Sequence, residues 1–513
     1  MRASIRPRRA QVRVIAALVV LVLLSPVLPA TWSIILVDTS TGEIAVGCAT
    51  CLTGLDLELY VPVIVVGTGG GCCQARIDGS GRNRRIIWDE LPKGTPPGDI
   101  LKLINDADPN FSSRQIGIVD MLGRRAAHTG TNTGGWSGHV KGRQGNISYA
   151  IQGNVLTGEP VILAARDAAL NTPGDLSEKL MAAMEAARAI GGDGRCSCGS
   201  DPEGCGSPPP DFDKSAHVGF MMLSRFGDVD GDCDGGIGCV NGVYYMNLNV
   251  ADQTAADEDP VIQLRGLFDA WRQELLGRPD HLLSEKQLTS NVLPGNGTAT
   301  TTMEIKLFDW AKNPIVSGGH QVVIAHAQDS AGLSSIGDVV DHGDGTYSVA
   351  LTSGVGQGID RFEVRVDDGQ GPVLLFPYPE LENGPTLLAD QDHLSASAGG
   401  TVTFSLIGPA AENGRHYLLL GSLSGTEPGI DLGGGIVLPL NPDVAMMCTY
   451  VDRNGPVLVD TEGFLSTDGS GSCQLVAPAG LLDRIVGLDV HFAYLLFQPI
   501  NYASNALSIT IDP

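Results

Sequence analysis

The chain has 513 residues, of which 43% are hydrophobic and 18% charged, and its formal net charge is −25. This composition indicates globular domains and excludes a disordered or fibrous chain, and at roughly 150 residues per domain the length predicts about three of them. The acidic balance excludes nucleic acid as a partner, because phosphate binding relies on basic patches.

The first 30 residues have the pattern of a secretory signal peptide. They carry five Arg and no acid, with the apolar run Val14–Leu24 and the small residue Ala30. This run is too short to cross a bilayer, and no later run reaches the roughly 20 apolar residues of a membrane helix. Its removal takes away five of the 33 basic residues and none of the 58 acidic ones, which leaves 28 against 58, a net charge of −30. We therefore expect a secreted, periplasmic or cell-surface protein with no membrane span after signal removal.

From Thr31 to Leu276 the sequence changes between strand and helix patterns. Two apolar runs, Trp32–Val37 and Glu43–Val46, enclose a polar turn and predict a hairpin. The other expected elements are, in chain order, a strand at Val61–Val66, a helix with Asp99 at its N-cap, strands at Gln115–Val119 and Ser148–Gln152, helices at Pro160–Ala169 and Leu176–Ile190, strands at His217–Leu223 and Val243–Val250, and a helix at Pro260–Leu276. Segregated runs of this kind indicate a layered α+β domain with helices covering the sheet faces.

Beyond about residue 291 the helical periodicity disappears. Pro294–Thr298 reads as a linker, and Pro377–Pro385 as a second break. The strand candidates are Met303–Phe308, Gln321–Ala325, Tyr347–Leu351, Phe362–Val366, Thr401–Ile407, Tyr417–Leu420, Gly435–Leu438, Val490–Phe497 and Ser508–Ile511. We therefore expect a signal peptide at 1–30, an α+β domain at 31–290, a β-sandwich at 291–380 and a second, C-terminal β-sandwich at 381–513.

All 11 cysteines follow the predicted signal peptide, so they would meet an oxidising compartment in which disulfides persist. Cys448 and Cys473 are the only ones after residue 239, and we expect them to pair with each other. An odd number leaves at least one thiol unpaired within the chain, or paired between chains.

Cleavage after Ala30 would make Thr31 the first residue of the mature chain. An N-terminal Thr carries a hydroxyl nucleophile and a primary amine, and the amine can accept the hydroxyl proton directly or through one water. The pKa of an α-amine is about 7.7–8.0, so a neutral fraction exists near physiological pH. The alternative is that Thr31 merely opens a core strand, in which Thr is a favourable residue.

Several short stretches together resemble the DUF1028 family. They are Thr31–Ile34, Thr41–Glu43, Arg114–Asp120, His128–Gly130, Gln152–Leu156 and Gly191–Arg195. The resemblance covers residues 31 to about 276. It implies an Ntn-hydrolase-like αββα sandwich with no established substrate, in a family whose members begin with Thr-aromatic-Ser-Ile, and so it points to the same Thr31. Thr301–Asp368 resembles bacterial immunoglobulin-like domains, which bind, space or present rather than catalyse.

Three more residues of these stretches suit an acyl-transfer site. Asn154, in a Gly-flanked turn after a strand, can face a developing oxyanion, or it can simply adopt a left-handed turn conformation. Asp193 and Arg195 follow a helix C-terminus and can hold the α-amine and a substrate carboxylate respectively, or form a structural ion pair. His128 is expected to pack rather than to catalyse.

The sequence departs from the family pattern at its cysteines. Cys48 and Cys51 have a spacing compatible with zinc or redox chemistry, although export favours disulfides. Cys72 and Cys73 follow a glycine run. An insertion at Cys196–Asp213 contains Cys198, Cys205 and Pro208–Pro210, and a disulfide-stapled loop at this place can restrict access to the proposed site.

An acidic cluster suggests a second kind of chemistry. Asp230, Asp232 and Asp234 occupy positions 1, 3 and 5 of a calcium loop, followed by Gly235. Asp228 precedes them, and Asn241 stands at position 12 in place of the bidentate Glu. The alternative is a solvated acidic loop tied down by Cys233 and Cys239. Structural calcium is thus a hypothesis, and no cofactor is required.

The leading interpretation is an exported N-terminal-nucleophile hydrolase acting on an amide or related acyl bond of an unknown small-molecule or peptide substrate. Its candidate catalytic residues are Thr31, Asn154, Asp193 and Arg195. The alternative is a non-catalytic cell-surface or periplasmic binding protein that uses the same fold as a scaffold, with a cell-surface ligand bound by the β domains.

Overall fold

The computed structural model describes residues 31–513, except 235, 410–411, 413 and 435. The predicted signal peptide, residues 1–30, lies outside the described residues. The chain divides into two compact units, one ending at Leu267 and the other beginning at Phe268, so that the boundary falls inside helix α6 (Pro260–Glu274).

The N-terminal unit contains two sheets and two pairs of covering helices. Its elements are β1 (Thr31–Asp38), β2 (Glu43–Thr50), β3 (Pro62–Val65), β4 (Gly69–Ala75), α1 (Arg82–Glu90), α2 (Pro97–Ala107), β5 (Arg114–Asp120), β6 (Arg125–Thr129), β7 (Trp136–Gln144), β8 (Ile147–Leu156), α3 (Pro160–Asn171), α4 (Leu176–Ala189), α5 (Gly194–Ser197), β9 (Val218–Ser224) and β10 (Met246–Val250).

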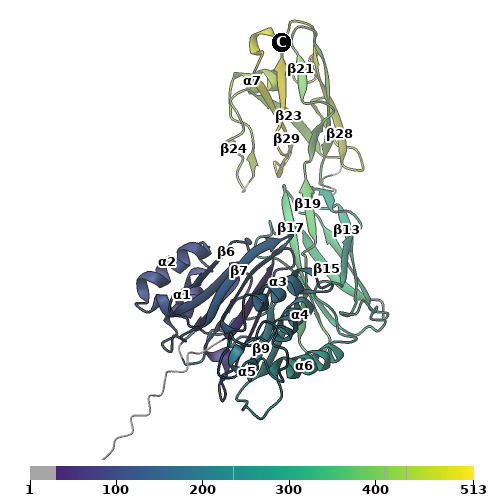
Figure 1. Cartoon of the computed structure of the whole chain (residues 1–513). Coiled ribbons are helices and arrows are strands. Elements are labelled where there is room, and N and C mark those ends of the chain that lie inside the picture. The colour runs from purple at the N-terminus through teal and green to yellow at the C-terminus, as the bar shows by residue number, and fades with distance from the viewer. Residues whose placement is uncertain (1–30, 235, 410–411, 413, 435) are drawn as a thin grey trace, which may run out of the picture. The chain divides into compact units, whose positions relative to one another are not determined.

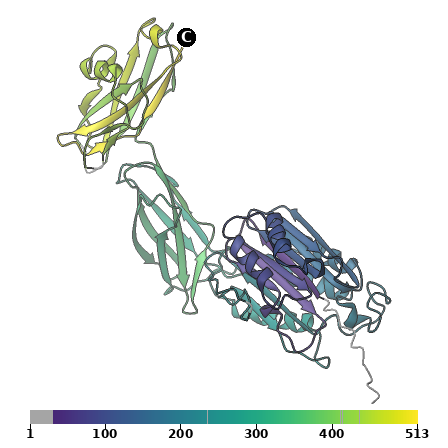
Figure 2. The ribbon, with the colours of Figure 1, turned by 90° about the vertical axis from the view of Figure 1, so that its left-hand side faces the viewer.

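These elements form a four-layered αββα sandwich, the arrangement that the family resemblance implies (Figures 1 and 2). One sheet has the order β10-β9-β2-β1-β8-β7 and the other β3-β4-β5-β6. Helices α3 and α4 pack on the first sheet, α1 and α2 pack on the second, and β1, β2 and β8 face β4 and β5 across the middle. The layers therefore leave β1 enclosed on both faces.

This enclosure explains the sequence of β1. In a strand with one solvated face apolar and polar residues alternate, whereas a strand covered on both faces is apolar throughout. Trp32, Ile34, Ile35 and Leu36 have no exposed surface. The largely apolar sequence of β1, in which even Ser33 is buried, is therefore what its place in the sandwich requires.

The end of α4 positions the candidate site. The helix begins at Asp175, whose carboxylate accepts hydrogen bonds from the backbone N–H groups of Ser177 and Glu178. It ends at Ala189, and Gly191 and Gly192 follow the C-cap Ile190 with φ of 105° and 56°. A Cβ at Gly192 would lie 2.7 Å from the Trp32 ring, so only glycine fits this left-handed position. The helix predicted at Leu176–Ile190 is thus confirmed to within one residue, and the two glycines bring the chain back beside β1.

Some local predictions were wrong. Asp99 lies in the first turn of α2, and Pro96 is the N-cap, because Pro97 has a φ suited to the first helical position. The strand β4, which contains the glycine run together with Cys72 and Cys73, was not predicted. Helix α1 and strand β7 were not predicted. Long polar side chains on these two segments obscure their periodicity.

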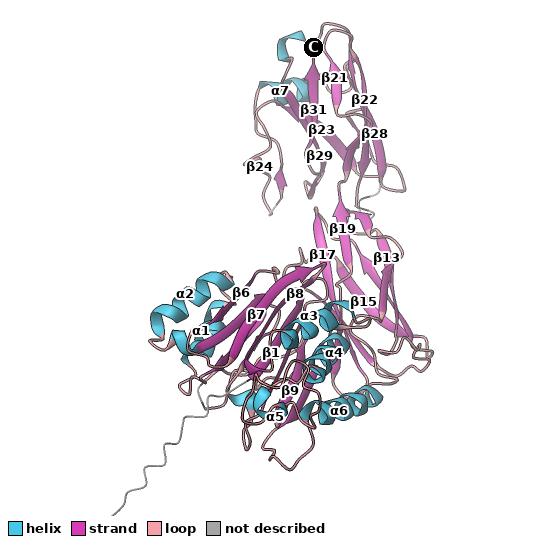
Figure 3. Ribbon diagram, in the orientation of Figure 1, coloured by secondary structure: helices cyan, strands magenta, loops and turns pink. Residues whose placement is uncertain are grey.

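The C-terminal unit contains the two predicted β-sandwiches (Figure 3). In the first, the order β11-β13-β16-β15 faces the order β12-β19-β17-β14, and in the second β20-β22-β28-β26 faces β21-β31-β29-β23-β27. The strands are β11 (Glu285–Leu288), β12 (Val292–Pro294), β13 (Thr300–Lys306), β14 (Gln321–His326), β15 (Ser335–Asp341), β16 (Thr346–Thr352), β17 (Gly358–Asp367), β18 (Pro372–Leu375), β19 (Glu380–Gly384), β20 (Leu387–Ala389), β21 (His393–Ser395), β22 (Gly400–Ile407), β23 (His416–Ser422), β24 (Ile430–Asp431), β25 (Val437–Leu438), β26 (Leu458–Val459), β27 (Glu462–Phe464), β28 (Ser470–Ala477), β29 (Asp489–Phe497), β30 (Tyr502–Ala503) and β31 (Leu507–Asp512).

One helix, α7 (Val444–Val451), interrupts the predicted all-β pattern of the last segment. Asp443 caps it by accepting a hydrogen bond from the backbone N–H of Met446 at 2.7 Å. Its eight residues carry no charge and show no polar stripe, so helical periodicity could not reveal it.

The predicted Cys448–Cys473 disulfide is wrong, because both residues are free. Cys473 is 1% exposed in β28, opposite Phe404 and inside the core of the second sandwich. Cys448 is exposed on α7, which packs beside β23. The pairs that do form are Cys51–Cys196, Cys198–Cys205 and Cys233–Cys239.

Cysteine accessibility provides a test of this arrangement. Iodoacetamide should modify Cys448 in the folded protein and leave Cys473 unmodified, because alkylation needs an accessible thiolate and burial raises the pKa of Cys473 to about 12. Mass spectrometry of tryptic peptides gives the answer. Cys448→Ser should prevent this labelling, and recovery of a Cys448–Cys473 cross-linked peptide would contradict the structure.

Candidate functional site

Thr31 lies at the start of β1, in the interior of its sheet between β2 and β8. It is paired with Asn154 of β8 and is 4% exposed. Its Oγ1 donates a hydrogen bond of 3.3 Å to Oγ1 of Thr50, the last residue of β2. The end of the sheet thus places two hydroxyl groups in contact.

The ion pair of Arg195 and Asp193 contacts this pair of hydroxyl groups through Thr50. Arg195 donates through Nη2 to Thr50 Oγ1 at 3.4 Å and to Asp193 Oδ2 at 2.7 Å. The Asp193 side chain has no exposed surface, and that of Arg195 is 15% exposed. Asp193 also accepts a hydrogen bond of 2.7 Å from the backbone N–H of Cys51. One connected polar cluster is therefore formed by Thr31, Thr50, Arg195 and Asp193. Within it, Asp193 and Arg195 form the ion pair that was one of the two alternatives for these residues.

Asn154 is also beside Thr31, but its predicted local structure was wrong. It lies within β8 rather than in a turn, has no exposed surface, and donates through Nδ2 to the carbonyl of Thr133 at 3.1 Å. The left-handed conformation falls instead on Val155, with φ of 51°. Strand β8 continues to Leu156, and its pairing with β7 shifts register at this point. The irregularity takes the place of the turn that the flanking glycine had indicated.

Sequence reasoning missed two glutamines of the second sheet that face Thr31. Gln74 of β4 donates through Nε2 to the Thr31 carbonyl at 3.0 Å and to Gln115 Oε1 at 2.7 Å. Gln115 of β5 donates to the carbonyl of Gly153 at 2.8 Å. Both are buried, and Gln74 Oε1 has no hydrogen-bond partner among the described residues. A signal existed for Gln115, which lies in one of the family-like stretches, whereas Gln74 and Thr50 had none.

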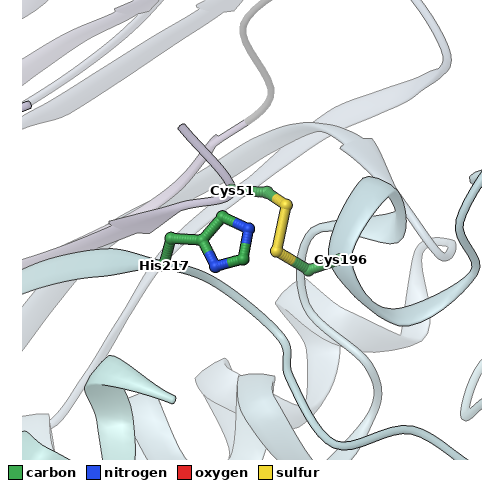
Figure 4. Close-up of side chains that lie close together, drawn as sticks. All are labelled: Cys51, Cys196 and His217. Atoms are coloured by element: carbon green, nitrogen blue, oxygen red, sulfur yellow. A yellow bond between two sulfur atoms is a disulfide. The ribbon is translucent and has the colours of Figure 1, made fainter. Parts of the chain in front are cut away.

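A disulfide lies next to the polar cluster around Thr31. Cys51 follows Thr50 and Cys196 follows Arg195, and their bond joins the end of β2 to α5 (Figure 4). The imidazole of His217 faces this bond, and the three ligand atoms lie within 4.8 Å of one another. Burial lowers the pKa of His217, and the nearby Lys214 charge lowers it further. Of the alternatives for Cys51, the structure contains the disulfide, with Cys196 rather than Cys48 as partner.

The acidic loop uses its side chains to accept hydrogen bonds from backbone N–H groups. Asp228 accepts from Arg225 and Tyr245, Asp230 from Val66, Asp234 from Gly236 and Ile237, and Asn241 from Asp232. Within the described residues these carboxylates do not form a close group, and Gly235 lies outside the description. The Cys233–Cys239 disulfide closes the loop, as the solvated-loop alternative expects. The calcium hypothesis stays a prediction.

His128 packs as expected. Its ring stacks on Phe111 with centroids 3.8 Å apart, and its Nε2 lies 3.1 Å from the Phe111 carbonyl oxygen. It is not part of the Thr31 cluster.

The fold and this cluster define an αββα sandwich domain followed by β-sandwich domains, and two family models match the same regions. Residues 31–200 match the family of unknown function DUF1028, and residues 282–372 match domain 3 of invasin. The chain therefore has one region that is similar to DUF1028 and a second region that is similar to domain 3 of invasin, each covering less than half of its length. The resemblance inferred from the short stretches is confirmed.

Solved structures resemble the chain at low identity. A DUF1028 protein from Silicibacter pomeroyi is 21% identical, over 47% of this chain and 85% of its own, with a TM-score of 0.35. The adhesin InvE of Yersinia pseudotuberculosis is 13% identical over 44% of this chain and 58% of its own, with a TM-score of 0.18. Invasin, described as a bacterial integrin-binding protein, is 11% identical over 94% and 60%, also at 0.18. None of the curated proteins compared with the chain matches it.

Asp228 gives a pH-dependent test of the acidic loop. Burial raises its pKa to about 6, against about 3.9 in an unfolded chain. Between these values the folded protein binds more protons, so stability should fall as the pH rises from about 4 to 6. In Asp228→Asn the amide oxygen can still accept both hydrogen bonds, and this part of the fall should disappear from calorimetric melting curves. Asp106→Asn, which removes an exposed charge, is the control, and an unchanged slope in Asp228→Asn would contradict the prediction.

The calcium hypothesis predicts a rise in melting temperature with calcium that magnesium reproduces poorly, since magnesium demands tighter octahedral geometry. At a hundredfold excess over the dissociation constant, one site adds roughly 2.7 kcal/mol to the free energy of unfolding. Replacing Asp230 and Asp232 together by Asn should remove most of the rise. An equal response of the double variant would identify the loop as a solvated acidic face.

Proposed function

We propose that the N-terminal unit is an N-terminal-nucleophile hydrolase that cleaves an amide or related acyl bond, with Thr31 as the nucleophile. The observation that supports this proposal is the connected cluster of Thr31, Thr50, Arg195 and Asp193. These residues come from three chain segments, which meet at the first residue of an inner strand. A merely structural threonine at a strand end needs no buried ion pair beside its hydroxyl.

The chemistry requires that cleavage after Ala30 frees the α-amine of Thr31. The amine then takes the proton of the Thr31 hydroxyl as its oxygen attacks the substrate carbonyl, and it returns that proton to the leaving group. Water releases the acyl group from the threonine in a second step. Residue 30 and the cleavage itself lie outside the described residues, so N-terminal sequencing is part of the test.

The surrounding residues have roles that follow from their contacts. Arg195 holds the Thr50 hydroxyl, which accepts from Thr31 and so fixes the rotamer of the nucleophile. Asp193 holds the guanidinium and keeps the buried charges balanced. Gln74 fixes the Thr31 carbonyl from the opposite sheet. Asn154, paired with Thr31, is our candidate for stabilising the oxyanion.

A second candidate function is non-catalytic binding at the cell surface or in the periplasm. The match of residues 282–372 to invasin domain 3 favours it, because domains of this kind present binding surfaces. No helix of the described residues is long and apolar enough to cross a membrane. In this interpretation the αββα domain is a scaffold and Thr31 is inert.

An acylating probe such as a β-lactone distinguishes the two functions. It should modify Thr31, Thr31→Ala should abolish the modification, and Thr31→Ser should keep part of it, because the reaction needs the hydroxyl and not the methyl group. Thr50→Val should slow labelling roughly tenfold or more, as expected for a misplaced nucleophile. Peptide mapping by mass spectrometry locates the adduct.

Thr39→Ala, just past the opposite end of β1, is the matched control and should label like the wild type. N-terminal sequencing must first find Thr31 at the start of the mature protein. A start elsewhere contradicts the hydrolase proposal, as does equal labelling of the wild type and Thr31→Ala. A correctly processed protein that takes no label favours the scaffold function.

A further inference from the structure

Cys51, Cys196 and His217 combine two sulfur donors and one imidazole at a single point, where their ligand atoms lie within 4.8 Å of one another (Figure 4). All three side chains are partly exposed. His217 Nδ1 is buried and has no hydrogen-bond partner among the described residues. That nitrogen lies on the side of the ring away from the disulfide, and the other ring nitrogen faces the two sulfurs (Figure 4).

The backbone holds the three residues together independently of the disulfide. The Cys51 N–H donates to Asp193 Oδ2 at 2.7 Å, and the Cys196 N–H donates to the Asp193 carbonyl at 3.0 Å. The His217 N–H donates to the Thr50 carbonyl at 2.8 Å. Opening the sulfur–sulfur bond would thus leave both thiols and the imidazole facing one another.

We propose that reduction of the Cys51–Cys196 disulfide converts this cluster into a zinc site with two thiolates and one imidazole as ligands. Thiolate and imidazole are the donors that zinc prefers, and three protein ligands with one open position are typical of reactive zinc sites. The partial exposure of all three side chains leaves room for water in the fourth position.

The dimensions suit zinc. With Zn–S bonds of about 2.3 Å and Zn–N bonds of about 2.0–2.1 Å, tetrahedral ligand atoms stand about 3.5–3.8 Å apart. The Cα atoms of Cys51 and Cys196 are 5.7 Å apart, so rotation of the two side chains can separate the sulfurs without moving the backbone. The imidazole already lies within the 4.8 Å limit.

The conversion balances as two steps. A dithiol gives two electrons and two protons to the disulfide, which becomes two thiols while the dithiol becomes a cyclic disulfide. Zinc then displaces the two thiol protons and binds both thiolates and the neutral imidazole. In the reverse direction a cyclic disulfide accepts two electrons from the two thiolates and becomes a dithiol, which restores the Cys51–Cys196 bond and releases the metal. The proposal does not depend on the hydrolase function, since none of the three ligands is assigned a role in acyl transfer.

Cobalt(II) is the probe, because thiolate coordination gives it a charge-transfer absorption. In a Cys448→Ser background, which removes the exposed thiol, protein reduced with a phosphine should bind one cobalt per chain with this absorption. One equivalent of zinc should abolish it, and unreduced protein should not develop it. Mass spectrometry after alkylation verifies that Cys51 and Cys196 are reduced.

Variants assign the ligands. Cys51→Ser and Cys196→Ser should lose the thiolate absorption or halve it, and His217→Gln should weaken zinc binding by more than about tenfold, the lower end of what even a supporting contact costs. The control is Cys198→Ser with Cys205→Ser, which removes the neighbouring disulfide and should bind cobalt like the parent. Melting of unreduced His217→Gln verifies its folding, because this variant keeps the disulfide.

Four results would each overturn the proposal: a Cys51–Cys196 bond that resists reduction in the folded protein, reduced protein without thiolate absorption, full absorption in Cys51→Ser and Cys196→Ser, or unchanged zinc affinity in His217→Gln. Loss of binding in the Cys198/Cys205 control would place the metal on the inserted loop and would overturn it equally. Failure of Thr31 labelling leaves all of these readouts unchanged.

Discussion

The buried carboxylate of Asp193 holds together the segments that form the candidate site. It accepts from the backbone N–H of Cys51 at the end of β2 and from the backbone and guanidinium of Arg195 in α5. The backbone of Asp193 adds two contacts: its N–H donates to the Ser215 carbonyl, shortly before β9, and it forms a β-bridge with Leu156 at the end of β8. A carboxylate without exposed surface costs several kcal/mol to desolvate, and the hydrogen bonds that it accepts from Cys51 and Arg195 offset that cost. Removing any one of them would leave a buried charge with incomplete compensation, so the segments are held together as a unit.

The disulfide adds a covalent connection to the same junction. Cys51 and Cys196 are 145 residues apart, and in the chain-entropy model a loop of that length destabilises the unfolded chain by about 5 kcal/mol. The hydrogen bonds of Asp193 fix the geometry of the folded state, whereas the disulfide restricts the unfolded state. The two contributions are separable, which is why the local arrangement can persist when the covalent bond is opened.

The sequence predicted those parts of the fold that depend on local pattern. The apolar residues after Thr31, the helical spacing of Leu176–Ile190 and the glycine pair after it each have a local cause, and so the layered domain could be inferred. Asn154 was misplaced because a Gly-Asn pair favours a turn in isolation, while pairing with β1 keeps it extended. Cys473 could not be excluded from a disulfide because only the register of β28 decides that its side chain points into the core. Gln74 became visible only once the second sheet was placed against the first, since no local pattern marks a side chain that crosses between sheets.

The polar cluster around Thr31 and the cluster of Cys51, Cys196 and His217 lie on two sides of the same backbone junction. Successive side chains of an extended chain point to opposite faces, so Thr50 directs its hydroxyl to Thr31 while Cys51 directs its sulfur to Cys196. The facing segment is arranged in the same way: Arg195 contacts Thr50, and Cys196 is bonded to Cys51. Asp193 is bonded to the backbone of both pairs. The Cys51–Cys196 disulfide and the Arg195–Thr50 hydrogen bond therefore join the same two backbone segments, and the hydrogen bond continues through the Thr50 hydroxyl to Thr31.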